Sequence, residues 1–467
     1  MLSENYTENL TAISEILRQG ESFDILRRTL AVGDSEMTFF YIDGFVKDGE
    51  LQRIMQYLLS KKKLPDASGT AALIPYSEVE VCRDADKAVT AILSGQTAML
   101  APEFGGEAVL LDLRTYPARE TAEPETDRVM QGARDGFVET LIMNTALLRR
   151  RIRDPRLVMK HFDIGGASHT DVVVCYMDGV AKRDYVRAVC DRIRASHPKT
   201  LTLGAQSLAE TLIRRKWYNP FPKIRTTERP DTAAAQVLEG NVLVFCDTSP
   251  EVMILPTSIF DFCEEADDYC FPPITGSYLR ILRIVTLLLS VVITPIWYLS
   301  LEYSDMLPPV LSFLLPDEPG TLPIILQLFL SEIALDVLKL ASMNTPNMLS
   351  NSLSVVGGLI LGDFAVGVGW ACEEVIFYMA LVAIANFAQQ SQELGYAFKF
   401  MRMIILALTC FFGIYGFFAG VAVFCAAVAT NTTVSGKRNY LYPLIPFDAR
   451  AMARHIFRFK KSDFDKK

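Results

Sequence analysis

Long apolar stretches are confined to the second half of the chain, between residues 280 and 436. A helix needs about 20 predominantly apolar residues to cross the hydrocarbon core of a bilayer. Four stretches meet this requirement, the third of them only with its flanks: 284–301, 352–370, 375–388 and 403–430. The pattern predicts an α-helical polytopic membrane domain over 280–436, followed by a short basic tail over 437–467.

A fifth apolar stretch, 321–341, is interrupted by Glu332, Asp336 and Lys339. Each charge at the centre of a spanning helix costs about 2.5–3.5 kcal/mol, whereas a residue such as Leu returns only about 0.3–0.6 kcal/mol. The three charges share one helix face, where Asp336 and Lys339 can form an ion pair. We therefore expect 321–341 to be either an amphipathic helix at the membrane surface or a helix buried against neighbours inside an oligomer. The four other stretches are predicted to be simple membrane crossings.

The distribution of basic residues predicts the orientation in the membrane. Arg280 and Arg283 precede the first apolar stretch, and further basic residues follow the last one, at 437–438. Because cytoplasmic segments are enriched in Lys and Arg, we expect both ends to be cytoplasmic, which requires an even number of crossings. With four crossings, Lys399 and Arg402 would face outward, which counts against that number.

The first 279 residues contain an internal repeat. Residues 40–47 (FYIDGFVK) resemble residues 175–182 (CYMDGVAK), and each copy follows a short apolar run and precedes an amphipathic helix. Later, 94–100 and 239–245 each begin a predicted β-hairpin after a helix. The repeat predicts a soluble region of two related α/β subdomains, at 1–165, including a polar connector, and at 166–279.

Composition limits the classes of function. Half of the 467 residues are hydrophobic, which excludes a disordered or collagen-like chain. The 54 acidic residues outnumber the 46 basic ones, which argues against a nucleic-acid partner. The nine cysteines show no CxxC spacing, and the four histidines form no cluster with them. The sequence therefore predicts reduced, mostly buried thiols, with no metal site, no disulfide framework and no cofactor.

Candidate chemistry in the first 279 residues is sparse. Asp43 and Asp178 each precede a glycine at the end of a predicted strand, which favours a tight turn over a ligand contact. The runs at 61–63 (KKK) and 149–153 (RRRIR) are predicted to be solvated faces, or, for the arginines, a surface that steers a partner or lipid headgroups. The sequence has no phosphate-binding loop and no HExxH motif, so we predict no enzyme activity.

Several longer motifs resemble those of a known family. Residues 134–139 (RDGFVE) with 144–156, and residues 218–222 (YNPFP) with 227–231, are similar to hallmark stretches of the A subunits of the GerA spore germination family. The membrane part resembles one branch of that family at 350–365, 378–388, 393–399 and 440–447. Residues 389–392 (QQSQ) depart from the loop expected there.

The resemblance implies a polytopic protein of the inner spore membrane in an endospore-forming bacterium, with a function in germination. It also implies a homo-oligomer in membrane lipid with a central ion-conducting path, for which another small membrane subunit is a conceivable partner. Two functions stay open at this point. One is an oligomeric ion channel or channel-forming subunit, and the other is a non-conducting receptor subunit that relays a germinant signal to a separate channel.

A stripe of polar and small residues follows Pro346, which suits the first turn of a helix. On that helix one face would carry Asn347, Asn351, Ser354, Gly358 and Gly362. Such a stripe either packs against another helix or faces water, and the two asparagine amides, which each need several hydrogen-bond partners, favour water. We predict that it lines the conducting path. Gly358-xxx-Gly362 and Gly416-xxx-Gly420 are also typical of close helix packing, within one subunit or between subunits around a pore.

Overall fold

The computed structural model describes residues 1–116, 132–213, 218–265, 267–316, 320–344, 362, 365–389, 391–434 and 440–459. The chain forms two compact units. The first comprises Met1–Arg215, Ile224–Thr257 and Val434–Lys437, and the second comprises Lys216–Lys223, Ser258–Thr433 and Arg438–Lys467.

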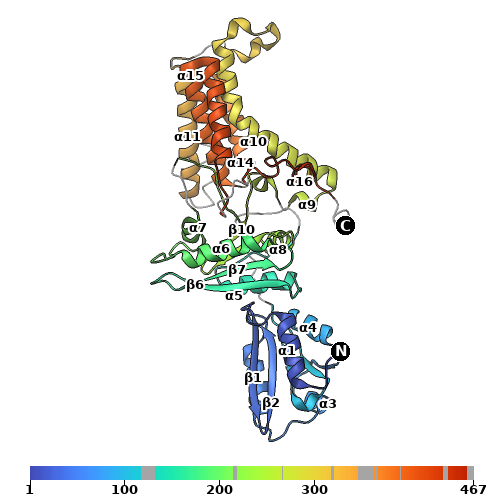
Figure 1. Ribbon diagram of the computed structural model, residues 1–467. Coiled ribbons are helices and arrows are strands. Elements are labelled where there is room, and N and C mark those ends of the chain that lie inside the picture. The colour runs from blue at the N-terminus through green and yellow to red at the C-terminus, as the bar shows by residue number, and fades with distance from the viewer. Residues whose placement is uncertain are drawn as a thin grey trace. The chain divides into compact units, whose positions relative to one another are not determined.

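The first unit contains two five-stranded antiparallel sheets with equivalent strand orders, β1-β2-β4-β5-β3 and β6-β7-β9-β10-β8 (Figure 1). In chain order, the strands of the first sheet are Ile25–Val32, Ser35–Ile42, Val79–Cys82, Thr97–Leu100 and Ala108–Leu111. Those of the second are Leu157–Ile164, Thr170–Met177, Arg225–Thr227, Val242–Cys246 and Val252–Leu255. The predicted pair of related α/β subdomains is confirmed.

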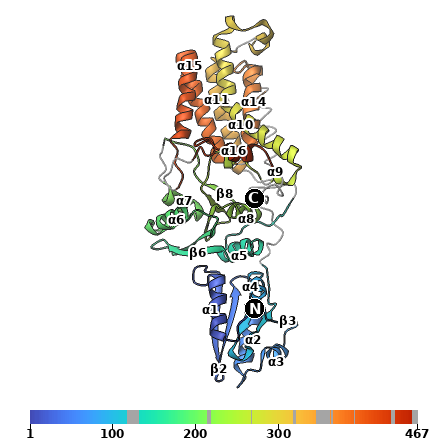
Figure 2. The same ribbon diagram turned by 45° about the vertical axis from the view of Figure 1, so that its right-hand side comes forward.

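The helices of the two subdomains also correspond in order. The first subdomain has α1 to α4, at Tyr6–Leu17, Asp48–Leu59, Ala67–Leu73 and Ala85–Leu93, and the short 3₁₀ helix η1 at Pro102–Phe104. The second has α5 to α8, at Leu141–Arg151, Arg183–Ala195, Ala205–Leu212 and Pro230–Leu238. In each copy, two strands are followed by two helices, a strand, a helix and a hairpin (Figure 2).

Each sheet has a hydrophobic core on both faces, because successive strand residues point to opposite sides. Phe40 of β2 packs in the core shared with α1 and α4, whereas the neighbouring Phe39 packs in the core shared with α2 and α3. In the second subdomain, Val172 of β7 faces α6 and α7, and Val173 faces α5 and α8. The runs of consecutive apolar residues in these strands are therefore the signature of sheets covered on both faces.

The repeated Asp-Gly pairs form turns, as predicted. Gly44 and Gly179 have φ of 77° and 82°, a left-handed conformation that glycine adopts without strain. The boundary between the subdomains lies earlier than the predicted division after residue 165. β6 pairs with β7 along its whole length, from Leu157 opposite Met177 to Ile164 opposite Thr170, so β6 and the preceding α5 belong to the second subdomain.

A buried arginine joins the two subdomains. The Arg149 side chain is wholly buried, and its Nε lies 2.8 Å from Oδ2 of Asp24, which directly precedes β1. Arg149 also donates to Ser22 Oγ at 3.2 Å and to the Leu157 carbonyl at 3.0 Å. The prediction of a solvated arginine face is therefore wrong for Arg149, because the side chain satisfies a buried carboxylate from the other subdomain.

The second unit is helical. Its long helices are α10 (Pro273–Glu302), α11 (Ile324–Asn344), α14 (Glu373–Phe387) and α15 (Gln392–Ala429), and α16 (Ala449–Ile456) follows near the C-terminus. Short helices lie at Phe260–Cys263 (η2), Asp267–Cys270 (α9), Ser304–Met306 (η3), Pro309–Leu314 (η4) and Ala365–Gly367 (α13). Among the described residues, α10 and α15 are long and apolar enough to cross a membrane. In the sequence, the α/β region precedes these helices.

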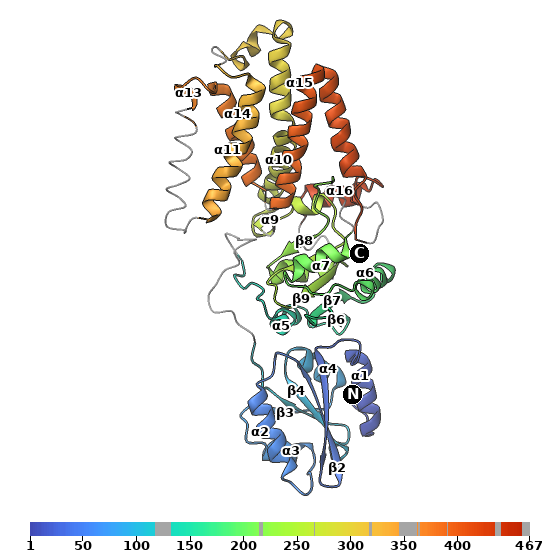
Figure 3. The ribbon, with the colours of Figure 1, turned by 90° about the vertical axis from the view of Figure 1, so that its left-hand side faces the viewer.

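The helix α15 consists of two arms that fold back on each other. Gly413 interrupts it with non-helical φ and ψ of 55° and −135°, and the two arms lie side by side in Figure 3. A Cβ atom on Gly416 would lie 1.9 Å from the Leu408 carbonyl oxygen, and one on Gly420 would lie 2.8 Å from Ile405 Cα. The predicted single stretch at 403–430 is thus a helical hairpin, and Gly416-xxx-Gly420 packs its arms within one subunit.

We expect Gly416→Ala to destabilise the hairpin by at least 1–3 kcal/mol, the typical range for overpacking, because the arms would have to separate around the new methyl group. Gly395→Ala is the matched control, since a Cβ at Gly395 meets nothing within 4 Å and alanine is about 1 kcal/mol better in a helix. The melting temperature of the purified protein in lipid nanodiscs checks both. Equal melting temperatures would show that the arms do not pack this closely.

An ionic cluster among the helices as candidate functional site

Four charged side chains from two helices meet inside the helical unit. α11 supplies Glu332 and Asp336, one turn apart, and α15 supplies Lys399 and Arg402, also one turn apart. Arg402 Nη2 and Nε lie 2.5 and 2.7 Å from Glu332 Oε1. Lys399 Nζ lies 2.5 Å from Asp336 Oδ2 and 3.4 Å from Glu332 Oε2. We call these four residues the ionic cluster.

Three residues of the ionic cluster, Glu332, Lys399 and Arg402, are buried, whereas the Asp336 side chain is 38% exposed, and backbone carbonyls as well as opposite charges contact the two bases. Arg402 is 1% exposed and Glu332 4% exposed. Arg402 Nη1 donates to the Ser290 carbonyl of α10 at 2.8 Å, and Lys399 Nζ donates to the Glu332 carbonyl at 3.0 Å. The cluster therefore ties α10, α11 and the first arm of α15 together.

The two acids and two bases of the ionic cluster balance each other when all four are ionised. Moving an unpaired charge into a low-dielectric interior costs several kcal/mol, and only excellent geometry and added hydrogen bonds offset that cost. Ionisable residues within membrane-embedded helices are rare and commonly mark functional sites. The ionic cluster is accordingly the strongest candidate for a site in the described helices.

The structure pairs the predicted intramembrane charges differently from the sequence-based prediction. Asp336 pairs with Lys399 across helices instead of with Lys339 on its own helix. The Lys339 ammonium hydrogen-bonds the side chain of Gln392 and lies 4.8 Å from the centre of the Tyr396 ring. The physical reason is that α15 presents Lys399 directly opposite the α11 carboxylates, which the i, i+3 spacing alone could not reveal. Glu332 is buried by neighbours within one chain.

The predicted pore stripe lies almost entirely outside the described residues. This holds for Asn347, Asn351, Ser354 and Gly358. Gly362 is described, and a side chain there would meet nothing within 4 Å. The assignment of this stripe to a conducting path stays a prediction.

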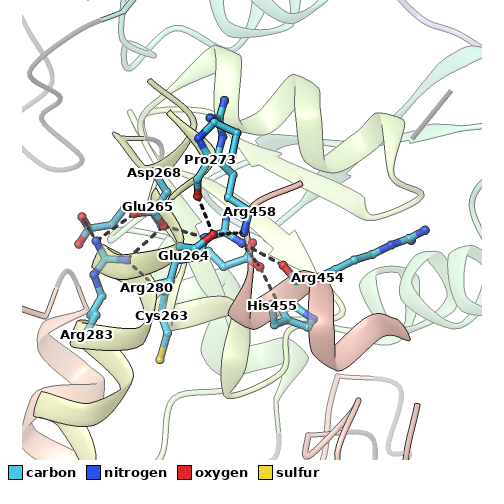
Figure 4. Close-up of polar contacts among 11 residues, drawn as sticks. Cys263, Glu264, Glu265, Asp268, Pro273, Arg280, Arg283, Arg454, His455 and Arg458 are labelled. Atoms are coloured by element: carbon cyan, nitrogen blue, oxygen red, sulfur yellow. Dashed lines mark hydrogen bonds and ion pairs between the residues drawn. The ribbon is translucent and has the colours of Figure 1, made fainter. Parts of the chain in front are cut away.

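A second set of ion pairs surrounds the start of α10 (Figure 4). Asp268 is fully buried and accepts from Arg280 Nε at 3.0 Å and from Arg283 Nη1 at 3.3 Å. Arg283 Nη2 also lies 2.6 Å from Glu265 Oε2. The tail joins this set, because Arg280 Nη1 donates to the Arg454 carbonyl at 3.0 Å. We call these contacts the α10 base.

Comparison with known proteins identifies the relatives of this chain. The family model described as "Bacillus/Clostridium GerA spore germination protein" matches residues 11–467. The chain belongs to the GerA family of spore germination proteins. This confirms the family resemblance found in the sequence.

Individual GerA-family relatives match over nearly their whole length. "Stage V sporulation protein AF" of Bacillus subtilis (strain 168) is 36% identical over 95% of this chain and 90% of the relative, in agreement with the branch to which the membrane motifs pointed. "Uncharacterized membrane protein YfkQ" of the same strain is 29% identical over 90% of this chain and 83% of the relative. "Spore germination protein KA", also of that strain, is 24% identical over 94% of this chain and 82% of the relative.

Among solved structures, the chain resembles the "Crystal structure of the N-terminal domain of the A subunit of the Bacillus megaterium spore germinant receptor GerK3". The sequence identity is 24%, with a TM-score of 0.40, and the match covers 54% of this chain and 95% of that one.

The sequence pattern does not mark Lys399 and Arg402 of this GerA-family chain as partners of the α11 acids. Taken alone, these two basic residues bear only on the orientation in the membrane. A signal was present, since both acids and both bases stand one helical turn apart within apolar surroundings. The matching spacing of opposite charges on two apolar helices is compatible with two ion pairs between them. The spacing does not show which helices are neighbours.

His455 of α16 is a titratable contact between the GerA-family tail and the α10 base. Its Nδ1 lies 2.9 Å from Glu264 Oε1. Burial by itself would lower the pKa of His455, and the charge of Arg280 acts in the same direction. The Glu264 hydrogen bond and the negative charges of Glu264 and Asp261 outweigh both, so the pKa is raised above 6.5. The contact thus favours the protonated imidazole.

We therefore expect the tail to be held more tightly in acid. A histidine whose pKa is raised in the folded state contributes stability that is complete below its unfolded pKa, about 6.5, and is lost as the pH rises through the folded value. Hydrogen exchange of residues 449–456, corrected for its intrinsic pH dependence, should show more protection at pH 6 than at pH 9. His455→Gln should remove this difference, and its persistence in that variant would exclude His455 as the cause.

Proposed function

We propose that this GerA-family protein is an oligomeric ion channel, or a channel-forming subunit, that promotes ion release when the dormant spore germinates. Its place would be the inner spore membrane, with the α/β region and the tail in the cytoplasm. The family assignment supports the germination function. The observation that carries the conducting role is the ionic cluster, because intramembrane ionisable residues commonly belong to ion pathways or to the elements that control them.

The ionic cluster would hold the bundle in a defined arrangement beside the path. Its charges neutralise one another and its backbone contacts join three helices, so α10, α11 and the first arm of α15 would move as one body. The path itself would be lined by the polar stripe at 347–362, whose asparagine amides are suited to contact with water. Opening would then require this stripe to shift relative to a rigid bundle.

An oligomer is supported by the outer faces of the helices. α11 exposes an apolar stripe at helical spacing, formed by Leu326, Leu330, Ile333, Val337, Leu340 and Met343. On α14 a similar face comprises Phe377, Leu381, Ile384 and Phe387. Faces of this kind suit lipid or another membrane helix, and copies of this chain packed through them would surround a central path.

The proposal is tested by ion flux through liposomes that contain only the purified full-length protein. We expect flux above that of empty liposomes, and we expect cysteines at 347, 351, 354 and 358 of a cysteine-depleted chain to make it sensitive to water-soluble thiol reagents. Cysteines at 353 and 360 are the matched controls on the opposite helix face and should be insensitive.

The outcomes separate the channel from its alternative. Flux without a difference between the two faces would keep the channel and reject the predicted lining. No flux from this chain, either alone or with other subunits of a germination complex, would favour the non-conducting receptor subunit that relays a signal to a separate channel.

A further inference from the structure

The helix α10 is longer than a membrane crossing requires. Its 30 residues span about 45 Å at 1.5 Å per residue, whereas the hydrocarbon core of a bilayer is about 30 Å thick. Both basic residues of α10 lie within its first eleven residues, where Arg280 and Arg283 pair with Asp268 in the α10 base. In a membrane-embedded α10, these charges would place its N-terminal end in the headgroup region.

The N-terminal end of α10 nevertheless keeps an exposed apolar face. Ile274 is 86% exposed and Tyr278 is 61% exposed, and the same stripe continues at helical spacing through Leu282 and Val285 into the apolar part of the helix. A stripe that runs without interruption from the spanning part into the headgroup region is a surface for the boundary between headgroups and acyl chains, where tyrosine is favoured.

The chain segment around α16 is fastened to this part of α10. The Arg458 backbone N–H donates to Ser277 Oγ at 3.0 Å, and the Arg458 guanidinium donates to the carbonyls of Tyr269 and Phe271. A Cβ on Gly276 would lie 3.1 Å from Arg458 Cδ, so the absence of a side chain there permits this approach. The tail is thus fastened to the N-terminal end of α10.

The fastened segment exposes large apolar side chains together with basic ones. Phe447 is 71% exposed and Phe457 is 48% exposed, and Leu444, Ile445 and Phe459 are exposed as well. Arg450 is exposed on α16, and 440–459 contains three arginines and one aspartate, Asp448. Apolar and basic side chains on one short segment are the composition of helices that lie in the plane of an anionic membrane surface.

We propose that residues 440–459 and the first turns of α10 form a collar that lies in the headgroup region and binds anionic phospholipids. The phenylalanines insert at the boundary with the acyl chains, and the exposed Arg450 contacts the headgroup phosphates. The collar anchors the tail to the lipid as well as to α10, and so couples the position of the α10 base to the composition of the membrane.

The test uses the full-length protein in vesicles of phosphatidylcholine and phosphatidylglycerol, with bromine atoms near the headgroup end of the acyl chains of one lipid at a time. Phe457→Trp and Phe447→Trp each add a fluorophore to the three native tryptophans. The emission of the added tryptophan is obtained by subtracting the emission of the unsubstituted protein. We expect brominated lipid to quench at least half of the added emission, with brominated phosphatidylglycerol about twice as effective as brominated phosphatidylcholine. Arg450→Gln in the same chains should reduce that twofold preference while quenching persists.

Three results would overturn the proposal. Quenching by aqueous iodide but not by brominated lipid, at both positions, would place the segment in water. Protection from both quenchers would show that protein covers it. Equal quenching by the two brominated lipids in the chain that retains Arg450 would leave an interfacial segment without recognition of anionic headgroups.

Discussion

Replacing Arg149 by methionine is expected to open the joint between the two α/β subdomains. The substitution leaves the Asp24 carboxylate buried without its partner, and removing one member of a buried ion pair typically costs about 3–5 kcal/mol. It also removes the donors to Ser22 Oγ and to the Leu157 carbonyl. Since about 1.4 kcal/mol corresponds to a factor of ten, opening should become at least about a hundredfold more frequent.

The buried thiol of Cys175 reports this opening. Burial raises its pKa, so the folded protein exposes almost no thiolate to a labelling reagent. The rate of Cys175 modification, followed by mass spectrometry in the full-length protein, should rise in Arg149→Met. Arg153→Met, an exposed arginine of the same run, is the control and should leave the rate unchanged. Asp24→Asn should partly restore protection in Arg149→Met, and an unchanged rate in Arg149→Met would show that the pair does not hold the joint.

Breaking the ionic cluster at Arg402 is expected to have an effect of similar size on the helical unit. Arg402→Met leaves Glu332 buried with only the longer contact to Lys399, and Glu332→Gln leaves Arg402 facing a neutral amide. Each single substitution should lower stability by about 3–5 kcal/mol, because a buried charge loses its partner. The melting temperature in lipid nanodiscs and the amount of protein in the membrane measure the loss.

The double variant distinguishes the pair from general damage to the core. Glu332→Gln combined with Arg402→Met removes both charges and leaves Lys399 paired with Asp336, so it should be more stable than either single variant. Lys339→Met on the same helix is the control, and its effect should stay below about 1 kcal/mol because Lys339 is only half-buried and contacts a neutral amide. Failure of the double variant to recover, or wild-type behaviour of both single variants, would contradict the pairing.

The turn-and-strand repeat made the duplicated α/β architecture predictable from local pattern. Asp43-Gly44 and Asp178-Gly179 stand at the ends of apolar runs, and a glycine with positive φ after a strand leaves few alternatives to a turn. The division after residue 165 was misplaced for a local reason too. β6 alternates buried and exposed residues only over part of its length, and it reveals itself as a strand chiefly by pairing with β7.

Local pattern could not reveal the partners of the charged side chains. Arg149 stands in a run of four arginines, where composition favours solvent, and only the arrival of Asp24 from 125 residues away buries it. The pairing of Glu332 with Arg402 spans 70 residues and depends on which helices are neighbours. Gly413, with its positive φ, likewise turns one apolar run into two arms, and nothing in hydropathy marks that reversal.

The sequence by itself determined the family, the duplication, and the separation of a charged α/β region from apolar helices. The family follows from the resemblance of longer motifs, whereas the duplication and the separation follow from periodicity and composition, which act over a few turns of helix or a single strand. Only the tertiary structure decided that Arg149 joins the two α/β subdomains, that Lys399 and Arg402 neutralise the acids of α11, and that the tail is fastened to α10. The reason is physical, since the free energy of a buried charge is set by the partner that the fold places beside it.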